Sequence, residues 1–253
     1  MKISYLVWIC CILGLTISPI FGQEAESFNP DEVIQRFLEK AEADSKYIGD
    51  NYTHYEREHT TDFKDGVAHK KREEHYFVEK KLGQEKPGLY KTLMLLNGSP
   101  PKKQRVEFKE ESFSISKKFL SRYDFAFIGE ETVGVASCWL FEFKGKPGYP
   151  EEKKQDRVLN NLEGRVWIEI ETHSFKKLVF NLADDVDFAS PGFMGAKVNK
   201  VDGVVEATTI EGQFAVSFAE VEYRYSARAF FFPIDGHSKK TIYYEKYERR
   251  NEQ

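Results

Sequence analysis

The chain is poor in cysteine, and this excludes a disulfide framework. Its 253 residues contain three cysteines, of which Cys10 and Cys11 lie in an apolar N-terminal run. Once that run is removed, Cys138 is left without a partner, so no intramolecular disulfide can form. Cys138 stands beside Trp139 in an expected strand, and we predict a buried, unreactive thiol.

Motifs of catalysis and metal binding are also missing. The sequence has no His-Glu-x-x-His, no Cys-x-x-Cys, no Gly-x-Ser-x-Gly and no glycine loop for phosphate. His54 and His59 are five residues apart, so on a strand they point to opposite faces. Asp185 and Asp187 fit a solvated acidic loop better than a cation site. We therefore expect no enzyme, no metal and no cofactor.

Neither acidic nor basic residues dominate the sequence. The chain has 37 basic and 41 acidic residues, interspersed, with a net charge of −4. No basic stripe is present, so nucleic acid is not expected as a partner. We expect a monomer whose membrane association is peripheral at most.

One long apolar run is present, at the N-terminus. Lys2 precedes nearly unbroken apolar sequence over residues 5–17, which is typical of a secretory signal. The run is short for a spanning helix, which needs about 20 residues. We predict a signal peptide at 1–22, cut after Gly22, followed by a single domain at 23–253. The alternative is an uncleaved segment that anchors an exported protein.

An amphipathic helix is predicted directly after this segment. Asn29 is a suitable N-cap and Pro30 suits the first helical position. Apolar residues then recur with helical spacing and form one stripe: Val33, Ile34, Phe37, Leu38 and Ala41. The helix should run to about Lys46, with Gly49 ending it, and its stripe must lie against an apolar surface.

The remainder is typical of antiparallel strands, and 15% of the chain is aromatic. A polar hairpin at 52–62 and 67–80, turning at Asp65-Gly66, is expected to be exposed or at a sheet edge. Residues 102–122 are expected to be a loop with a short helix, and 144–164 a long charged connection. Further strands are predicted at 89–96, 124–128, 136–143, 165–170, 176–182, 213–224, 226–232 and 240–248, with a turn at Asp235-Gly236 in the last hairpin.

Several of these strands carry one apolar face, and together they predict a curved antiparallel sheet with a large apolar concave side. Such a face is either an ordinary core or the lining of a hollow for an apolar ligand. The residues that would line the hollow are Phe125, Phe127, Trp139, Phe141, Phe143, Val166, Ile168, Leu178, Phe180, Phe214, Val216 and Phe218.

Three stretches resemble a known family when they are combined with the exported helix and the strand ladder. They are YDFAFIGEETVG at 123–134 followed by CWLFEF at 138–143, GRVWIE at 164–169, and KLVF at 177–180. This pattern resembles the LolA/LolB-like outer-membrane lipoprotein-sorting proteins of Gram-negative bacteria. The resemblance implies an α+β, mainly β fold, in which a curved antiparallel sheet forms an incomplete β-barrel. An N-terminal amphipathic helix and short helices would pack on its concave side.

The resemblance also implies a function and a place. Proteins of this kind are periplasmic and take up acyl chains of lipoproteins, or other lipids, in the hollow. Relatives with the same fold act as sensors of envelope stress. We therefore carry two hypotheses: a non-catalytic lipid or lipoprotein carrier, and an envelope scaffold or sensor. The second would use the polar hairpin at 52–80 as the surface for a protein partner.

Overall fold

The computed structural model describes residues 28–81, 88–94, 106–109, 117–189, 194–229 and 232–250. The predicted signal peptide at 1–22 lies outside these residues. The strands are β1 Tyr52–Lys64, β2 Val67–Lys81, β3 Gly88–Met94, β4 Val106–Lys109, β5 Tyr123–Val133, β6 Ala136–Gly145, β7 Leu162–Glu169, β8 Phe175–Leu182, β9 Val186–Ala189, β10 Met194–Ile210, β11 Gln213–Ala229 and β12 Phe232–Arg249. The helices are α1 Pro30–Asn51, α2 Lys117–Leu120 and α3 Asp156–Leu159.

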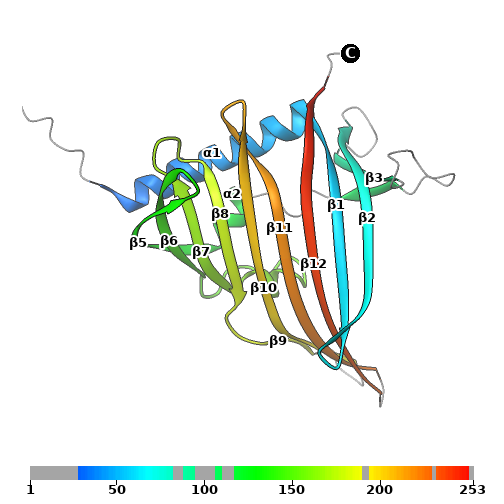
Figure 1. The fold of residues 1–253 in the computed structure, drawn as a ribbon. Helices are drawn as coiled ribbons and strands as arrows, with labels where there is room; N and C mark the ends of the chain where they lie inside the picture. Colours follow the sequence, from blue (N-terminus) through cyan, green and yellow to red (C-terminus); the bar gives the residue numbers. More distant parts are fainter. Residues whose placement is uncertain are drawn as a thin grey trace, which may run out of the picture.

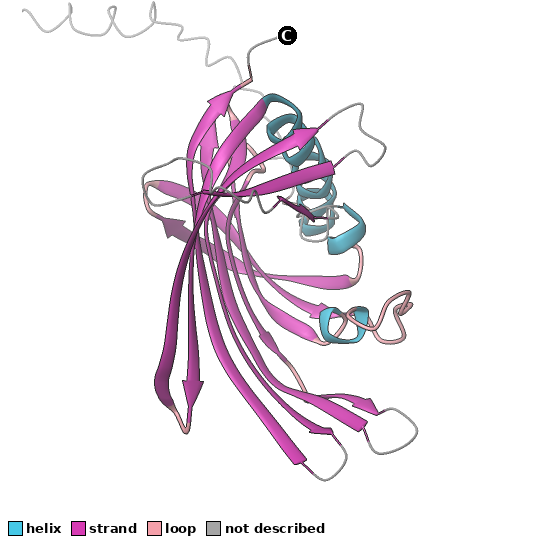
Figure 2. Cartoon of the chain, turned by 90° about the vertical axis from the view of Figure 1, so that its right-hand side faces the viewer, coloured by secondary structure: helices cyan, strands magenta, loops and turns pink. Residues whose placement is uncertain are grey.

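The described strands form one antiparallel sheet in the order β4-β3-β2-β1-β12-β11-β10-β8-β7-β6-β5, with β9 paired to β10 (Figure 1). Its two ends do not meet, so the curved sheet is an incomplete barrel. Figure 2 shows the helices on the concave side of the curve, with α1 near the upper end of the long strands and the short helices below it. The fold class predicted from the sequence is confirmed.

The first helix begins as predicted and ends later. The Asn29 side chain accepts a hydrogen bond from the backbone N–H of Asp31 at 3.1 Å, and the predicted apolar stripe is buried. Gly49 does not end the helix, which continues to Asn51 and passes directly into β1. The N–H of Tyr52 still bonds to the carbonyl of Ile48, so a glycine within the last turn leaves the helical hydrogen bonds intact.

The polar hairpin turns at Asp65-Gly66 as predicted, but it is not at a sheet edge. β1 lies between β2 and β12, and β2 lies between β1 and β3. The charged residues Glu56 and Glu58 are buried, whereas the first residues of β2, 67–73, are exposed. The error arose because buried charges can be paired by residues far along the chain, which the local pattern does not reveal.

The longest strand that was not predicted from the sequence is β10. This strand pairs with β11 on one side and with β8 and β9 on the other. Its Asp202-Gly203 step reads as a turn, yet Gly203 is extended and lies beneath the ring of Phe180. A Cβ on Gly203 would stand 2.2 Å from Cζ of that ring, so the glycine makes room for an aromatic side chain on the neighbouring strand.

The predicted turn at Asp235-Gly236 is wrong for the same reason. β12, Phe232–Arg249, runs through it, and Ala229 at the end of β11 pairs with Phe232. A Cβ on Gly236 would stand 2.2 Å from the ring of Tyr225. Tyr225 itself lies within β11, which is one strand and not two.

Smaller differences concern strand ends and short elements. Gly129 does not begin a loop but follows a β-bulge inside β5, and the connection to β6 shortens to Gly134-Val135. Short strands β4 and β9 occupy parts of stretches that were predicted to be loops, while α2 confirms the predicted short helix. Cys138 is fully buried, as expected, and burial raises the pKa of its thiol.

Candidate functional site

The concave side of the sheet is apolar beneath α1. A single cluster of buried residues joins the helix stripe to β5–β8, β10 and β11. Its members are Val33, Ile34, Phe37, Leu38, Ala41, Leu120, Tyr123, Phe141, Phe143, Leu162, Val166, Ile168, Phe175, Leu178, Phe180, Val205 and Phe214. The predicted apolar face therefore exists, and α1 covers part of it.

Eleven of the twelve predicted lining residues gather in this region. The buried ones are Phe141, Phe143, Val166, Ile168, Leu178, Phe180 and Phe214, and the half-buried ones packed on them are Phe125, Phe127, Trp139 and Val216. Phe218 lies apart and contacts the ring of Tyr243 at 5.4 Å between centroids. The pairing shifts by one residue between Val216 and Phe218, and this bulge turns Phe218 to the opposite, convex face.

At one end of the cluster the side chains leave a hollow. It contains about 330 Å³ of space free of protein atoms, including space open to solvent, and a water-sized sphere just fits inside. Nine side chains line it: Phe119, Leu120, Tyr123, Phe125, Phe143, Leu162, Val166, Leu178 and Phe180. Five of these were predicted. Phe119 and Leu120 on α2, Tyr123 and Leu162 were missed, since they stand in or beside stretches without strand alternation.

The other end of the predicted lining is covered by the chain itself. The ring of Phe28, just before α1, lies 4.4 Å from that of Phe127 and 5.9 Å from that of Trp139, between centroids. These two positions are therefore less open to a ligand than those around the hollow.

A buried arginine lies beside the hollow. Nη1 of Arg122 donates to Asn160 Oδ1 at 2.9 Å and lies 3.5 Å from Asp156 Oδ1. The guanidinium carbon is 5.6 Å from the ring centroid of Phe119 and 5.5 Å from that of Tyr149. The backbone N–H of Lys153, aided by Arg122, holds the pKa of Asp156 below its usual range. The buried Nε of Arg122 has no hydrogen-bond partner within the described structure.

Across the sheet, the concave side becomes polar. Lys91 is 2% exposed and contacts the carboxylates of Glu56 and Glu58. Lys240 Nζ reaches Glu58 at 2.8 Å, and Lys91 Nζ lies 4.1 Å from the ring centroid of Tyr76. Burial lowers the pKa of Lys91, but the two carboxylates outweigh it and raise the pKa overall. Buried ion pairs thus occupy this half of the concave side, whereas the buried apolar cluster lies in the first half.

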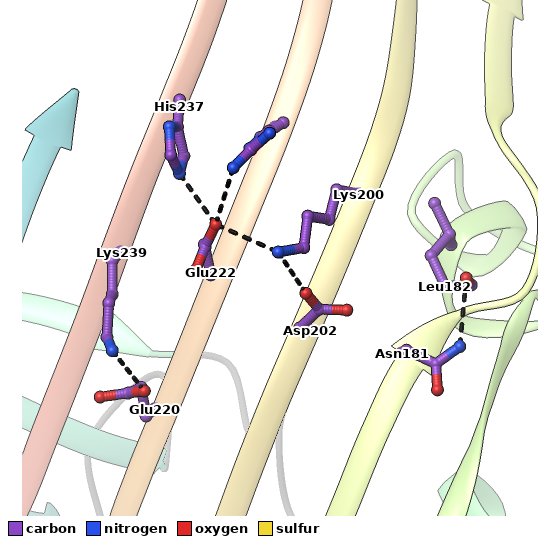
Figure 3. Close-up of polar contacts among 9 residues, drawn as sticks. Asn181, Leu182, Lys200, Asp202, Glu220, Glu222, His237 and Lys239 are labelled. Atoms are coloured by element: carbon purple, nitrogen blue, oxygen red, sulfur yellow. Dashed lines mark hydrogen bonds and ion pairs between the residues drawn. The ribbon is translucent and has the colours of Figure 1, made fainter. Parts of the chain in front are cut away.

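The convex face carries half-buried ion pairs across the longest strands (Figure 3). Glu222 lies 2.9 Å from His237 Nε2 and 3.2 Å from Lys200 Nζ, and Lys239 Nζ reaches Glu220 at 2.6 Å. Burial raises the pKa of Glu222, but its hydrogen bonds with His237 and Lys200 hold it below its usual range. These pairs join β10, β11 and β12 and leave little unbalanced charge.

Within the part of the chain that the structure describes, no group of three or more His, Cys, Asp or Glu side chains is placed to hold a metal ion. None of the helices within those ranges has the length and apolar character that a membrane span requires.

No protein-family model matches the chain, and no curated protein matches it in sequence. Solved structures do match. A LolA superfamily protein from Nitrosomonas europaea has 12% identity and a TM-score of 0.37, covering 87% of this chain and 94% of its own. A DUF1329 family protein from Desulfovibrio piger has 13% identity and a TM-score of 0.35, covering 85% and 92%.

An outer membrane lipoprotein-sorting protein domain from Vibrio parahaemolyticus has 8% identity and a TM-score of 0.45, covering 88% of this chain and 92% of its own. These matches agree with the resemblance drawn from the sequence. At such low identity and TM-scores, the matches concern the fold alone. The function is therefore argued from the residues of this chain. The chain is thus similar in structure to LolA superfamily and lipoprotein-sorting proteins.

Proposed function

We propose that the protein is a non-catalytic binding protein that holds the hydrocarbon of a lipid, or the acyl chains of a lipoprotein, in the apolar hollow. The observation that carries this proposal is the hollow itself, whose nine lining side chains leave space beside an otherwise packed core. The hollow as it stands admits little more than a water-sized sphere, well below the about 300–1,000 Å³ of ligand pockets, so an acyl chain would have to move the half-buried side chains at its rim apart. Each methylene buried there would contribute about 0.8 kcal/mol.

The concave face offers further apolar surface to a longer chain. Val201 and Val221 pack against the core, and Tyr223 and Tyr225 follow at alternate positions along β11. Tyr223 and Tyr225 are 37% and 39% exposed, and Figure 2 shows the strands extending past the helices at this end. Hydrocarbon that leaves the hollow would thus remain on an apolar strip.

The proposal places this activity outside the inner membrane. Cleavage of residues 1–22 would release a single domain at 23–253 into the periplasm, where its contact with membranes would be peripheral. Retention of the segment would instead leave the same domain tethered. In either case the hollow faces lipids or lipoproteins of the envelope.

The first test is native mass spectrometry of protein purified from the periplasm, with extraction of what co-purifies. A matched pair of variants then locates the site, measured with a fluorescent acyl probe. Phe125 lines the hollow, whereas the next residue, Ala126, is exposed on the other face of β5. Phe125→Asp should weaken probe binding at least ~10-fold, because it puts a charge where hydrocarbon would lie.

Ala126→Asp serves as the control and should bind the probe within about twofold of the wild type, since the same charge is then solvated. Co-purifying lipid together with this difference would support the proposal. A protein free of lipid that takes up no acyl probe would overturn it and leave the apolar face as ordinary core.

The scaffold or sensor function is the second candidate, and one observation favours it. The outer half of β2 is exposed and carries Lys70, Lys71 and Arg72, on a hairpin that protrudes at the lower end in Figure 2. Reversal of these three charges to glutamate should abolish cross-linking to an envelope protein if the hairpin is a partner surface. Arg57 is a poorer choice for reversal, because it is engaged with Glu245 at 2.7 Å.

A further inference from the structure

We infer that Arg122 forms an oxyanion subsite beside the hollow, next to Phe119, so that the preferred ligand is a hydrocarbon chain ending in a carboxylate or phosphate. This inference rests on the proposed function and adds the chemistry of the ligand's polar end. It starts from a single unsatisfied donor. Arg122 is 6% exposed, and its buried Nε has no hydrogen-bond partner among the described residues.

An unpaired buried N–H is unusual, because leaving one without an acceptor costs about 1–3 kcal/mol. The other described polar contacts of this guanidinium go through Nη1, which faces Asn160 Oδ1 and Asp156 Oδ1. Nε lies on the side edge of the guanidinium, where carboxylate and phosphate oxygens bind in a fork geometry. The side chain is thus held in place while one donor suited to an oxyanion is left without an acceptor.

The position of this donor relates it to the hollow. The guanidinium carbon lies 5.6 Å from the ring centroid of Phe119, which lines the hollow. The next residue along the chain, Tyr123, also lines it and is fixed by a hydrogen bond of 2.8 Å from its hydroxyl to the carbonyl of Leu159. Because Nε is buried, a ligand whose chain lies in the hollow would bring its head to the guanidinium by displacing the half-buried ring of Phe119.

Charge around the subsite favours an anion. Asp156 is the one carboxylate paired with the guanidinium in the described structure, and its 3.5 Å separation is longer than the ~2.7–2.9 Å of a strong charge-assisted bond. Asp156 also accepts hydrogen bonds from the backbone N–H groups of Glu152 and Lys153, at 2.9 and 2.8 Å. Its charge is thus shared with the loop, and Lys146, bonded to the carbonyl of Ser121 at 2.9 Å, adds a cation nearby.

The experiment compares three probes with the same C12 chain, all below their micelle concentrations: dodecanoate, dodecyl phosphate and dodecanol. Dissociation constants are measured by displacement of a fluorescent acyl probe. For the wild type we expect the anionic probes to bind at least ~10-fold more tightly than dodecanol, the effect of one charge-assisted hydrogen bond. Arg122→Gln should bring this ratio close to one. Arg157→Gln, which removes an exposed arginine paired with Glu151, should keep the ratio.

A ratio close to one in the wild type would overturn the inference but leave the proposed function standing, because all three probes would still bind. Failure of every probe to bind would overturn the proposed function first. A preference for only one anion would identify the head as carboxylate or phosphate. If Arg122→Gln does not fold, the Nε–Hε NMR resonance of Arg122 in the wild type decides. It should shift with dodecanoate and not with dodecanol, and no shift would indicate a solely structural arginine.

Discussion

Asp44 on α1 accepts a hydrogen bond from the backbone N–H of Phe214 on β11, with 3.0 Å between Oδ2 and N. The carboxylate is 1% exposed, and Lys40 Nζ lies 2.9 Å from its other oxygen. Nearby, the hydroxyl of Tyr47 donates to Glu211 at 3.0 Å. The C-terminal half of α1 is thus attached to the β10–β11 turn by specific polar contacts, in addition to the apolar stripe.

Replacement of Asp44 should destabilise the fold. Asp44→Ala leaves the N–H of Phe214 buried without an acceptor, so the free energy of unfolding should fall by about 1.5–3 kcal/mol. Glu42→Ala, at an exposed position on the same helix, is the control and should change it by less than about 0.5 kcal/mol. Urea unfolding followed by circular dichroism measures both. Equal stability of the two variants would mean that the helix is held by its apolar stripe alone.

The two strand glycines lead to a second prediction. Both Gly203 and Gly236 lie under aromatic rings, but Phe180 is 4% exposed whereas Tyr225 is 39% exposed. Phe180 cannot move without disturbing the core, so Gly203→Ala should cost about 1–3 kcal/mol of stability. Tyr225 can swing into solvent, and Gly236→Ala should be milder. Thermal unfolding of the two variants tests this order, and the reverse order would contradict it.

These glycines also show which features of the fold could not be predicted from the sequence. The start and the stripe of α1 were predictable, since Asn29, Pro30 and the i, i+3, i+4 spacing act within a few residues. Gly236 was predicted to be a turn residue and the strand around Gly203 was missed, because the rings that require these glycines belong to neighbouring strands. Nothing local distinguishes a glycine that turns the chain from one that admits a ring.

The lining of the hollow was likewise predictable where it depends on local alternation, and not where it depends on strand pairing or on a short helix. Alternation alone placed Phe125, Phe143, Val166, Leu178 and Phe180 on one face, where they line the hollow. It misplaced Phe218, because the bulge that reverses its direction depends on the pairing of β11 with β10. The residues of α2 were missed, since a four-residue helix has too few positions to show a period.

The buried lysine on the polar half of the concave side gives a third prediction. Lys91→Met would remove the buried cation that Glu56 and Glu58 share and leave two carboxylates close together, which should cost about 3–5 kcal/mol. Lys240→Met is the matched control and should cost less, since that side chain is 36% exposed and Glu58 is the one carboxylate it reaches among the described residues. A double-mutant cycle of Lys91→Met with Glu58→Gln, read from urea midpoints, should give a clear coupling energy. Additive effects would contradict the pairing.

Tyr244, which lies near Glu56, should make the stability of the fold depend on pH in the alkaline range. Burial, and then the nearby charge of Glu56, raise the pKa of Tyr244 far above its usual value. The unfolded phenol titrates near pH 10. Below that pH both states hold the proton and stability is unaffected, whereas above it the unfolded state alone releases the proton. Stability should therefore fall by about 1.4 kcal/mol per pH unit above 10 from this residue alone.

Tyr244→Phe keeps the ring and removes the proton, so its stability should fall less steeply with pH than that of the wild type, by about that slope. Burial also raises the pKa of Tyr247 and Tyr123, and these residues should leave some pH dependence in the variant. Urea unfolding at steps between pH 9 and 11 measures the two slopes, with Tyr225→Phe as the control for loss of an exposed phenol. Parallel slopes for wild type and Tyr244→Phe would show that this phenol is accessible to water in the folded protein and that burial does not raise its pKa.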